Sequence, residues 1–255
     1  MAGVEAKPRK RDRLKARARR YVDLPLSLRT ADLPRRAASA VVMLAVAAFA
    51  AWQGGVVLDA FIALVALVCF GEFVLLILRA TRKPINRLAA IPAGAVYIGG
   101  AALVLATQDL YHLIAVVGAV IFTDTSAYFA GRTIGGPKIA PRISPSKTWA
   151  GLAGGMAGSA LWLVVYMGLA HNTGHGVTRA ASMALSGGEV LFWGAVGAVL
   201  AVAAQAGDFF ESWLKRKAGK KDSSNLIPGH GGVFDRVDGL LPVALIVGLL
   251  AVPAG

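Results

Sequence analysis

The feature that most constrains this chain is a series of long apolar runs along its length. A helix needs about 20 mostly apolar residues to cross the roughly 30 Å hydrocarbon core of a bilayer. Polar segments separate the runs, and the first and last runs are the shortest. We place the runs at Ala37–Trp52, Val56–Leu78, Leu88–Leu105, Tyr111–Phe129, Trp149–Leu169, Val190–Ala206 and Leu240–Val252.

The composition supports spans in a membrane rather than a buried soluble core. The chain of 255 residues is 56% hydrophobic and 16% charged, whereas soluble domains average about 25% charged residues. Lipid offers no partners to backbone N–H and C=O groups, so an apolar span of this length must be helical. The sequence therefore predicts an all-α, polytopic transmembrane bundle of about seven spans over residues 37–255.

The positive charges indicate how these spans are oriented. Residues 1–36 carry 12 Lys or Arg and four acids, as expected of a basic arm lying against anionic headgroups. With the N-terminus in the cytoplasm, 26 of the 27 Lys and Arg are cytoplasmic and only Arg179 is not. We expect a multi-pass protein of the cell (inner) membrane with cytoplasmic catalytic loops near residues 131–148 and 205–238. No motif supports a nucleic-acid partner.

The polar stretch 205–238 is the obvious place for chemistry in so apolar a chain. It holds five acids and six bases, which are Asp208, Glu211, Asp222, Asp235, Asp238, Lys215, Arg216, Lys217, Lys220, Lys221 and Arg236. Residues three or four apart share a helix face, which groups Asp208 with Glu211 and Asp235 with Asp238. Carboxylates, a Gly-rich turn and Lys or Arg side chains are together what a metal-bound polyphosphate requires.

The same stretch closely resembles the C-terminal signature of the phosphatidate cytidylyltransferases, also called CDP-diacylglycerol synthases. The matching positions are Ser212-x-Leu214-Lys215-Arg216, Lys221-Asp222 and Ile227-Pro228-x-His230-Gly231-Gly232-Val233-x-Asp235-Arg236-Val237-Asp238. A match of this length with fixed internal spacings is far more specific than a single glycine motif.

A second segment is similar to the same family. It reads Gly131-Arg132-x-x-Gly135-Gly136-x-Lys138, followed by Ile143-Ser144-Pro145-Ser146-Lys147-Thr148-Trp149. The family run continues with Glu, and this chain has Ala150 there, so any role of that acid must be absent or supplied by another group. The two segments cover roughly a quarter of the chain.

The resemblance implies an enzyme that transfers CMP from CTP to phosphatidate in the bilayer. The products are CDP-diacylglycerol, for phospholipid biosynthesis, and pyrophosphate. Mg²⁺, as one or two ions, would be held by Asp208, Asp235, Asp238 and Glu211, and Asp124 joins the first three as a catalytic candidate. Phosphate or substrate contacts are expected of Lys147, Ser144, Ser212, Lys215, Arg216, Lys221, His230 and Arg236. A homodimer is left open.

Two acids lie inside predicted spans, where a charge is costly and must face the bundle interior or a wet cavity. Asp124, within Thr123–Tyr128, is near the predicted cytoplasmic end of its span, and its polar neighbours favour a functional role. Glu72 lies in mid-span, where either hydrogen bonds to another helix or a link to the polar cavity would account for it.

Two other functions share some of these features. A related membrane enzyme acting on another lipid, such as a CDP-archaeol synthase or a polyprenol kinase, would also need acids and basic loops. A proton- or ion-coupled transporter would use Glu72, Asp124 and Asp208 as relay groups. The transporter would not require the basic cluster Lys215–Lys221 beside a Gly-rich turn, and no inverted repeat of the spans is evident.

Overall fold

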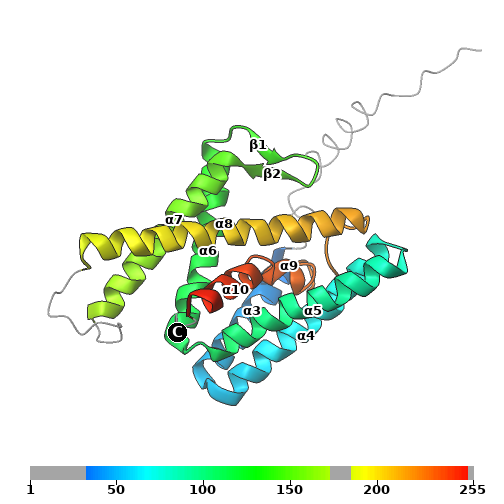
Figure 1. Cartoon of the computed structure of the whole chain (residues 1–255), viewed down its shortest axis with the longest axis horizontal. Coiled ribbons are helices and arrows are strands. Elements are labelled where there is room, and N and C mark those ends of the chain that lie inside the picture. Colours follow the sequence, from blue (N-terminus) through cyan, green and yellow to red (C-terminus); the bar gives the residue numbers. More distant parts are fainter. Residues whose placement is uncertain (1–32, 173–184, 252–255) are drawn as a thin grey trace, which may run out of the picture.

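The computed structural model describes residues 33–172 and 185–251, which form eight α-helices and one two-stranded hairpin (Figure 1). The long helices come first and the two short ones last. Their bounds are α3 Leu33–Gln53, α4 Gly55–Ala80, α5 Pro84–Thr107, α6 Leu110–Thr133, α7 Trp149–Asn172, α8 Gly187–Lys217, α9 Phe234–Val237 and α10 Leu240–Ala251.

Six of the described helices, α3 to α8, are long and apolar enough to cross a membrane, and α10 is a shorter apolar helix. Each of the seven predicted spans coincides with one of these helices, which confirms a polytopic helical bundle. The cytoplasmic position of the N-terminus stays a prediction. Most of the basic arm, residues 1–32, lies outside the described residues, as does Arg179.

Local sequence signals set where the helices begin. Pro84 starts α5, where its missing N–H would have no helical partner. The carboxylate of Asp109 accepts from the His112 N–H at 2.8 Å and so caps α6. Ser186 and Glu189 form a capping box at the start of α8. These caps satisfy N–H groups that helix ends leave without partners.

The loop predicted near residues 131–148 is partly a β-hairpin. Strands β1, Lys138–Ala140, and β2, Ser144–Thr148, pair antiparallel with Lys138 opposite Thr148 and Ala140 opposite Ser144. Prolines at positions 137, 141 and 145 oppose a continuous helix here. In Figure 1 the hairpin projects beyond the ends of α6 and α7.

Small residues bring the central helices close together. A Cβ added to Gly118 of α6 would lie 2.2 Å from the Trp162 ring of α7, and one added to Gly158 would lie 2.0 Å from the Ser126 hydroxyl. A Cβ at Gly197 of α8 would lie 2.6 Å from the backbone oxygen of Ser159. The helices α6, α7 and α8 therefore pack backbone against backbone, as small residues permit in membranes.

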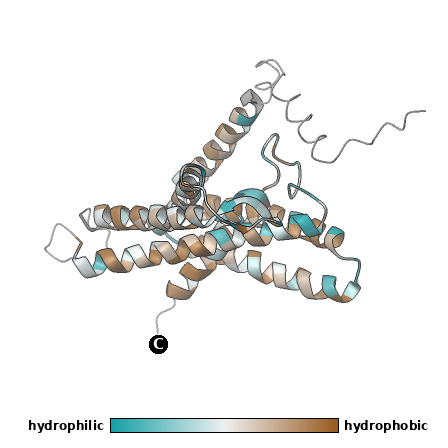
Figure 2. Ribbon diagram, turned by 90° about the horizontal axis from the view of Figure 1, so that it is seen from above, coloured by the Kyte–Doolittle hydropathy of each residue, from teal (hydrophilic) through white to brown (hydrophobic). Residues whose placement is uncertain are grey.

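The segment that carries the family resemblance lies against α4 and α8. We call residues 218–233, between α8 and α9, the signature loop. Phe234, at the start of α9, is buried and packs edge-on against Phe73 of α4, with ring centroids 6.1 Å apart. Apolar residues follow most of the helices, and hydrophilic residues gather near helix ends and loops (Figure 2). A polar site is thus held between apolar helices.

Candidate active site

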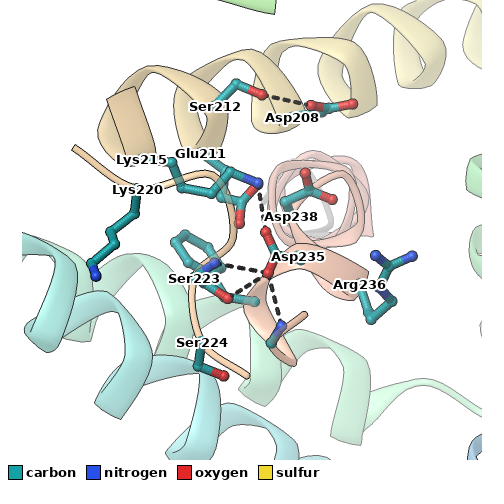
Figure 3. Close-up of polar contacts among 12 residues, drawn as sticks. Asp208, Glu211, Ser212, Lys215, Lys220, Ser223, Ser224, Asp235, Arg236 and Asp238 are labelled. Carbon is teal, nitrogen blue, oxygen red and sulfur yellow. Dashed lines mark hydrogen bonds and ion pairs between the residues drawn. The ribbon is translucent and has the colours of Figure 1, made fainter. Parts of the chain in front are cut away.

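Lys215 of α8 lies between two buried carboxylates. Its Nζ is 2.5 Å from Glu211 Oε2, one helical turn away, and 2.5 Å from Asp235 Oδ1 on α9. The side chains of Glu211 and Asp235 are 1% and 5% exposed, so water screens these charges little. Figure 3 shows all three side chains pointing toward one another. Lys215 therefore neutralises charge that would be costly to bury alone.

The second oxygen of Asp235 fixes the signature loop. Oδ2 accepts from the Ser223 N–H at 2.9 Å, the Ser223 hydroxyl at 2.8 Å and the Gly232 N–H at 2.8 Å (Figure 3). Burial would raise the pKa of Asp235, but the surrounding Glu211, Lys215, Gly232 N–H and Ser223 outweigh burial and hold it well below its ordinary range. Asp235 is thus an ionised anchor between α8, α9 and the loop.

A second ion pair joins the hairpin to α8. The Nζ of Lys147, on β2, lies 2.5 Å from Asp208 Oδ2 and donates to Gln205 Oε1 at 2.8 Å. The Ser212 hydroxyl donates to Asp208 Oδ1 at 3.2 Å, one turn further along α8 (Figure 3). The two segments that resemble the cytidylyltransferases therefore meet at this pair.

Asp238 lies beside Asp208. A Cβ on residue 207 would lie 2.2 Å from the backbone oxygen of Asp238. Because residue 207 is glycine, α8 can approach the end of α9. Burial raises the pKa of Asp238 to about 7, and the charges of Asp208 and Asp124 act in the same direction against the Gly239 N–H and Lys215. The charges of Asp208 on α8 and Asp124 on α6 thus act on Asp238 at the end of α9.

The carboxylates of this centre are the kind of ligand that Mg²⁺ prefers, but they do not form a complete metal site by themselves. Within residues 33–172 and 185–251, no group of three or more His, Cys, Asp or Glu side chains could hold a metal ion. Glu211 Oε1 is buried without a hydrogen-bond partner among the described residues, an acceptor that a cation would satisfy. Mg²⁺ is commonly bound through one or two carboxylates together with substrate phosphates, which suits Asp208 and Asp238.

The remaining predicted phosphate contacts lie around this centre rather than in it. Arg216 and Arg236 are exposed, and their described hydrogen bonds go to backbone oxygens, of Ile143 and Lys220 and of His230 respectively. In Figure 3 the Arg236 side chain points away from the carboxylates. Lys221 is exposed and Ser144 is buried on β2. Their phosphate-binding roles stay predictions.

His230 contacts α3 within the described residues. Its Nδ1 lies 2.9 Å from the Ser39 hydroxyl, which is also 3.0 Å from the backbone oxygen of Pro228. The signature turn is therefore tied to the first described helix. Ser39 could not be predicted from the sequence, because a single serine in an apolar run has no distinctive neighbours.

Glu72 of α4 reaches the same loop, which answers the question that its sequence position left open. It accepts hydrogen bonds from Ser223, Ser224, Val233 and Phe234 and is 5% exposed. Sequence reasoning missed the two serines, since they carry no charge and stand outside the matched motif positions. A charge in mid-span was the signal that singled out Glu72.

Comparisons with known proteins show which family this chain resembles. The model of the cytidylyltransferase family matches residues 88–252. A phosphatidate cytidylyltransferase of Brucella melitensis is 42% identical over 166 residues, which are 61% of this chain and 54% of the relative. Phosphatidate cytidylyltransferases of Haemophilus influenzae and Pseudomonas aeruginosa are 39% identical over 139 residues and 41% identical over 143 residues. These two alignments cover 52% and 56% of this chain, and 44% and 48% of the relatives.

The chain thus spans about half the length of the curated relatives that it matches. The family match includes both segments that meet at Lys147 and Asp208, together with the loop anchored by Asp235. It also covers more than half of the chain, from the start of α5 through α10. The chain therefore belongs to the cytidylyltransferase family.

Proposed function

We propose that this chain is a phosphatidate cytidylyltransferase that transfers CMP from CTP to phosphatidate. The products are CDP-diacylglycerol, for phospholipid biosynthesis, and pyrophosphate. The observation that carries the proposal is the ion pair of Lys147 with Asp208, which joins the two segments that resemble this family, with the Asp238 backbone packed against the neighbouring Gly207. The relatives from Brucella melitensis and Haemophilus influenzae are phosphatidate cytidylyltransferases, which supports the same reaction.

The chemistry requires little acid or base catalysis from the protein. The phosphate monoester of phosphatidate has a second pKa near 6, so it is already largely ionised at neutral pH. It attacks the α-phosphorus of CTP, and the bond to the pyrophosphate oxygen breaks. Repulsion between the two anions dominates the barrier, and holding them in line in a field of fixed cations lowers it.

The cations differ in how free they are to contact phosphate. The side chain of Lys147 is 15% exposed and pairs with Asp208, which is 35% exposed, and Arg216, Lys221 and Arg236 are exposed. These four are the proposed phosphate contacts, with Ser144, Ser212 and His230 as further hydrogen-bonding groups. Lys215 forms ion pairs with Glu211 and Asp235. We therefore propose that it contributes a fixed positive charge near the phosphates rather than a direct contact.

Mg²⁺ is the proposed cofactor. Asp208 and Asp238 would hold it, with Glu211 Oε1 as a further acceptor, while Asp235 would position the loop. When bound, the ion would supply a Lewis acid that offsets charge on the phosphate oxygens. Asp124, which is exposed on α6, would add negative charge near Asp238.

Orientation follows from the distribution of Lys and Arg. We place the N-terminus, the hairpin and the signature loop in the cytoplasm of a bacterial cell, with the helices in its inner membrane. Water-soluble CTP would then meet phosphatidate at the cytoplasmic surface. Labelling of single introduced cysteines in the hairpin, in intact cells, tests this orientation. A homodimer stays a prediction, which the mass of the purified particle tests.

The reaction is tested with purified full chain, phosphatidate, Mg²⁺ and CTP labelled at either the α- or the γ-phosphorus. We expect label in the lipid phase from the α-position alone. Label from the γ-position would instead indicate a lipid kinase. Absence of label from both positions would contradict transfer from CTP to phosphatidate and would favour another substrate or a transporter.

A further inference from the structure

Glu72 is a buried acid that the proposed chemistry does not use. It lies in the middle of α4, which ends before residue 88, where the family match begins. Its side chain is 5% exposed, and the groups around it come from the signature loop and from α9 rather than from another long helix. A charge buried at this depth needs a specific arrangement of donors to offset its lost hydration.

The four donors divide evenly between the two oxygens. Oε1 accepts from the Ser224 hydroxyl at 2.5 Å and from the Val233 N–H at 3.1 Å. Oε2 accepts from the Phe234 N–H at 2.7 Å and lies 3.0 Å from the Ser223 hydroxyl, whose one proton it shares with Asp235 Oδ2. Each oxygen thus meets one hydroxyl, which can turn, and one backbone N–H, which can only donate.

Glu72 is also connected to the catalytic carboxylates. The Ser223 hydroxyl lies 3.0 Å from Glu72 Oε2 and 2.8 Å from Asp235 Oδ2, so one serine faces both acids. Asp235 in turn contacts Lys215. A chain of contacts therefore runs from α4 through the signature loop to α9 and α8.

The glycine at position 232 makes this approach possible. A Cβ there would lie 2.0 Å from the Ser223 hydroxyl oxygen and 2.5 Å from Glu72 Oε2. Real Cβ atoms do not come so close, so with any larger residue the Ser223 hydroxyl, the Glu72 carboxylate or the loop itself must move. The Gly231-Gly232 pair thus has a packing role beside any contact with a ligand.

We propose that Glu72 is the positioning residue of the signature loop: its carboxylate fixes Ser223, Ser224 and the first N–H groups of α9, and through them the place of Asp235. Glu72 touches no reacting group. Its effect on turnover rests on the proposed function, whereas its effect on the loop does not. The chain carries this residue outside the segment that defines the family match.

Glu72→Gln is the sharpest test because it keeps the size of the side chain. An amide accepts at its oxygen and donates at its nitrogen. Whichever way it turns, its NH₂ group faces either the Val233 N–H or the Phe234 N–H, and that N–H loses its acceptor. The matched control is Asp59→Asn, the same chemical change at an exposed position of the same helix.

Two readouts on full-length protein in nanodiscs separate the parts of the inference. In Glu72→Gln, we expect amide hydrogen exchange over residues 219–237 to be about 10- to 100-fold faster, the consequence of one buried N–H without an acceptor. Exchange in α6 and α7 should match the wild type. For transfer of α-label, kcat per folded molecule should fall by about 10- to 100-fold, more than KM for CTP rises, because the loop is misplaced while Lys147 is untouched.

Each outcome decides something. Unchanged exchange over residues 219–237 would overturn the inference, and so would faster local exchange with an unchanged kcat. If the wild type transfers no label, the proposed function fails, and the exchange measurement still decides whether Glu72 fixes the loop.

If Glu72→Gln does not fold, Ser224→Ala tests the same inference. This change leaves the carboxylate in place and removes one donor from Oε1. Faster exchange over residues 219–233, which lose one of their bonds to Glu72, would support the inference. Unchanged exchange over these residues would overturn it.

Discussion

The Nζ of Lys147 lies 2.5 Å from Asp208 Oδ2, and this ion pair joins the β-hairpin to the C-terminal half of α8. The two residues come from the two segments that separately resemble the cytidylyltransferases. Gln205 supports the pair from one turn before Asp208. A bound polyphosphate would compete with Asp208 for Lys147, since phosphate oxygens are strong acceptors of charge-assisted hydrogen bonds.

Loss of the Lys147 charge should therefore weaken CTP binding. We expect Lys147→Gln to raise KM for CTP by about tenfold or more, because a phosphate loses one charged contact worth roughly 1.5–3 kcal/mol. Steady-state kinetics of α-label transfer measure this. The matched control is Arg142→Gln, an exposed arginine in the turn between the two strands of the hairpin, for which KM should stay within about twofold. Equal effects of the two changes would argue against a specific role for Lys147.

Asp238 is expected to contribute to Mg²⁺ binding. Asp238→Asn removes one anionic ligand beside Asp208, so transfer should require more Mg²⁺ and fall by about 100-fold at saturating CTP, a loss typical of one electrostatic contact at the reacting phosphate. A Mg²⁺ titration of the transfer rate checks this. Asp59→Asn should leave both the rate and the Mg²⁺ requirement unchanged. A variant at position 238 with the wild-type Mg²⁺ dependence would count against the metal role.

The sequence was enough to predict the helices, whereas the catalytic and binding roles of the site residues stay predictions. Each apolar run became a helix because lipid leaves no other way to satisfy the backbone. The i, i+3 and i, i+4 spacings placed Asp208, Glu211 and Ser212 on α8, and the structure also brings Asp238 beside Asp208. Asp124, predicted from its depth in a span, influences the same group.

Contacts between distant segments were beyond the sequence. The hairpin was expected as a loop, since short strands with prolines have no clear period. Lys215, predicted to contact phosphate, pairs with Glu211 and Asp235, and no spacing rule could place α9 against α8. The partners of Glu72 lie far along the chain, so only the fold could identify them.

Lys215 should matter for stability as well as for activity. Lys215→Met leaves Glu211 and Asp235 buried without their shared cation, which should cost about 3–5 kcal/mol of unfolding free energy. The loss of folded protein on heating in detergent measures this. The control is Lys217→Met, an exposed lysine near the end of the same helix whose Nζ lies 4.2 Å from the Trp213 ring centroid. Its expected cost is no more than about 1 kcal/mol. Similar stabilities of the two variants would contradict the role given to Lys215.

Gly232 should tolerate no side chain, because the signature loop passes directly against Glu72. In Gly232→Ala, the new methyl group would lie 2.0 Å from the Ser223 hydroxyl oxygen and 2.6 Å from Glu72 Oε1, so the loop must move outward. A displacement of about 1 Å is enough to cost roughly 100-fold in turnover. Transfer of α-label should fall by that factor while the helices keep their circular dichroism.

Gly99→Ala is the matched control, since a Cβ at Gly99 of α5 meets no atom within 4 Å. That change should leave transfer unaltered. If Gly232→Ala were as active as Gly99→Ala, the close approach of the loop to Glu72 would not be needed for turnover. We expect lower activity in Gly232→Ala than in Gly99→Ala, because Ser223 must stay between Glu72 and Asp235. Through Ser223, α4 then sets the position of a carboxylate on α9.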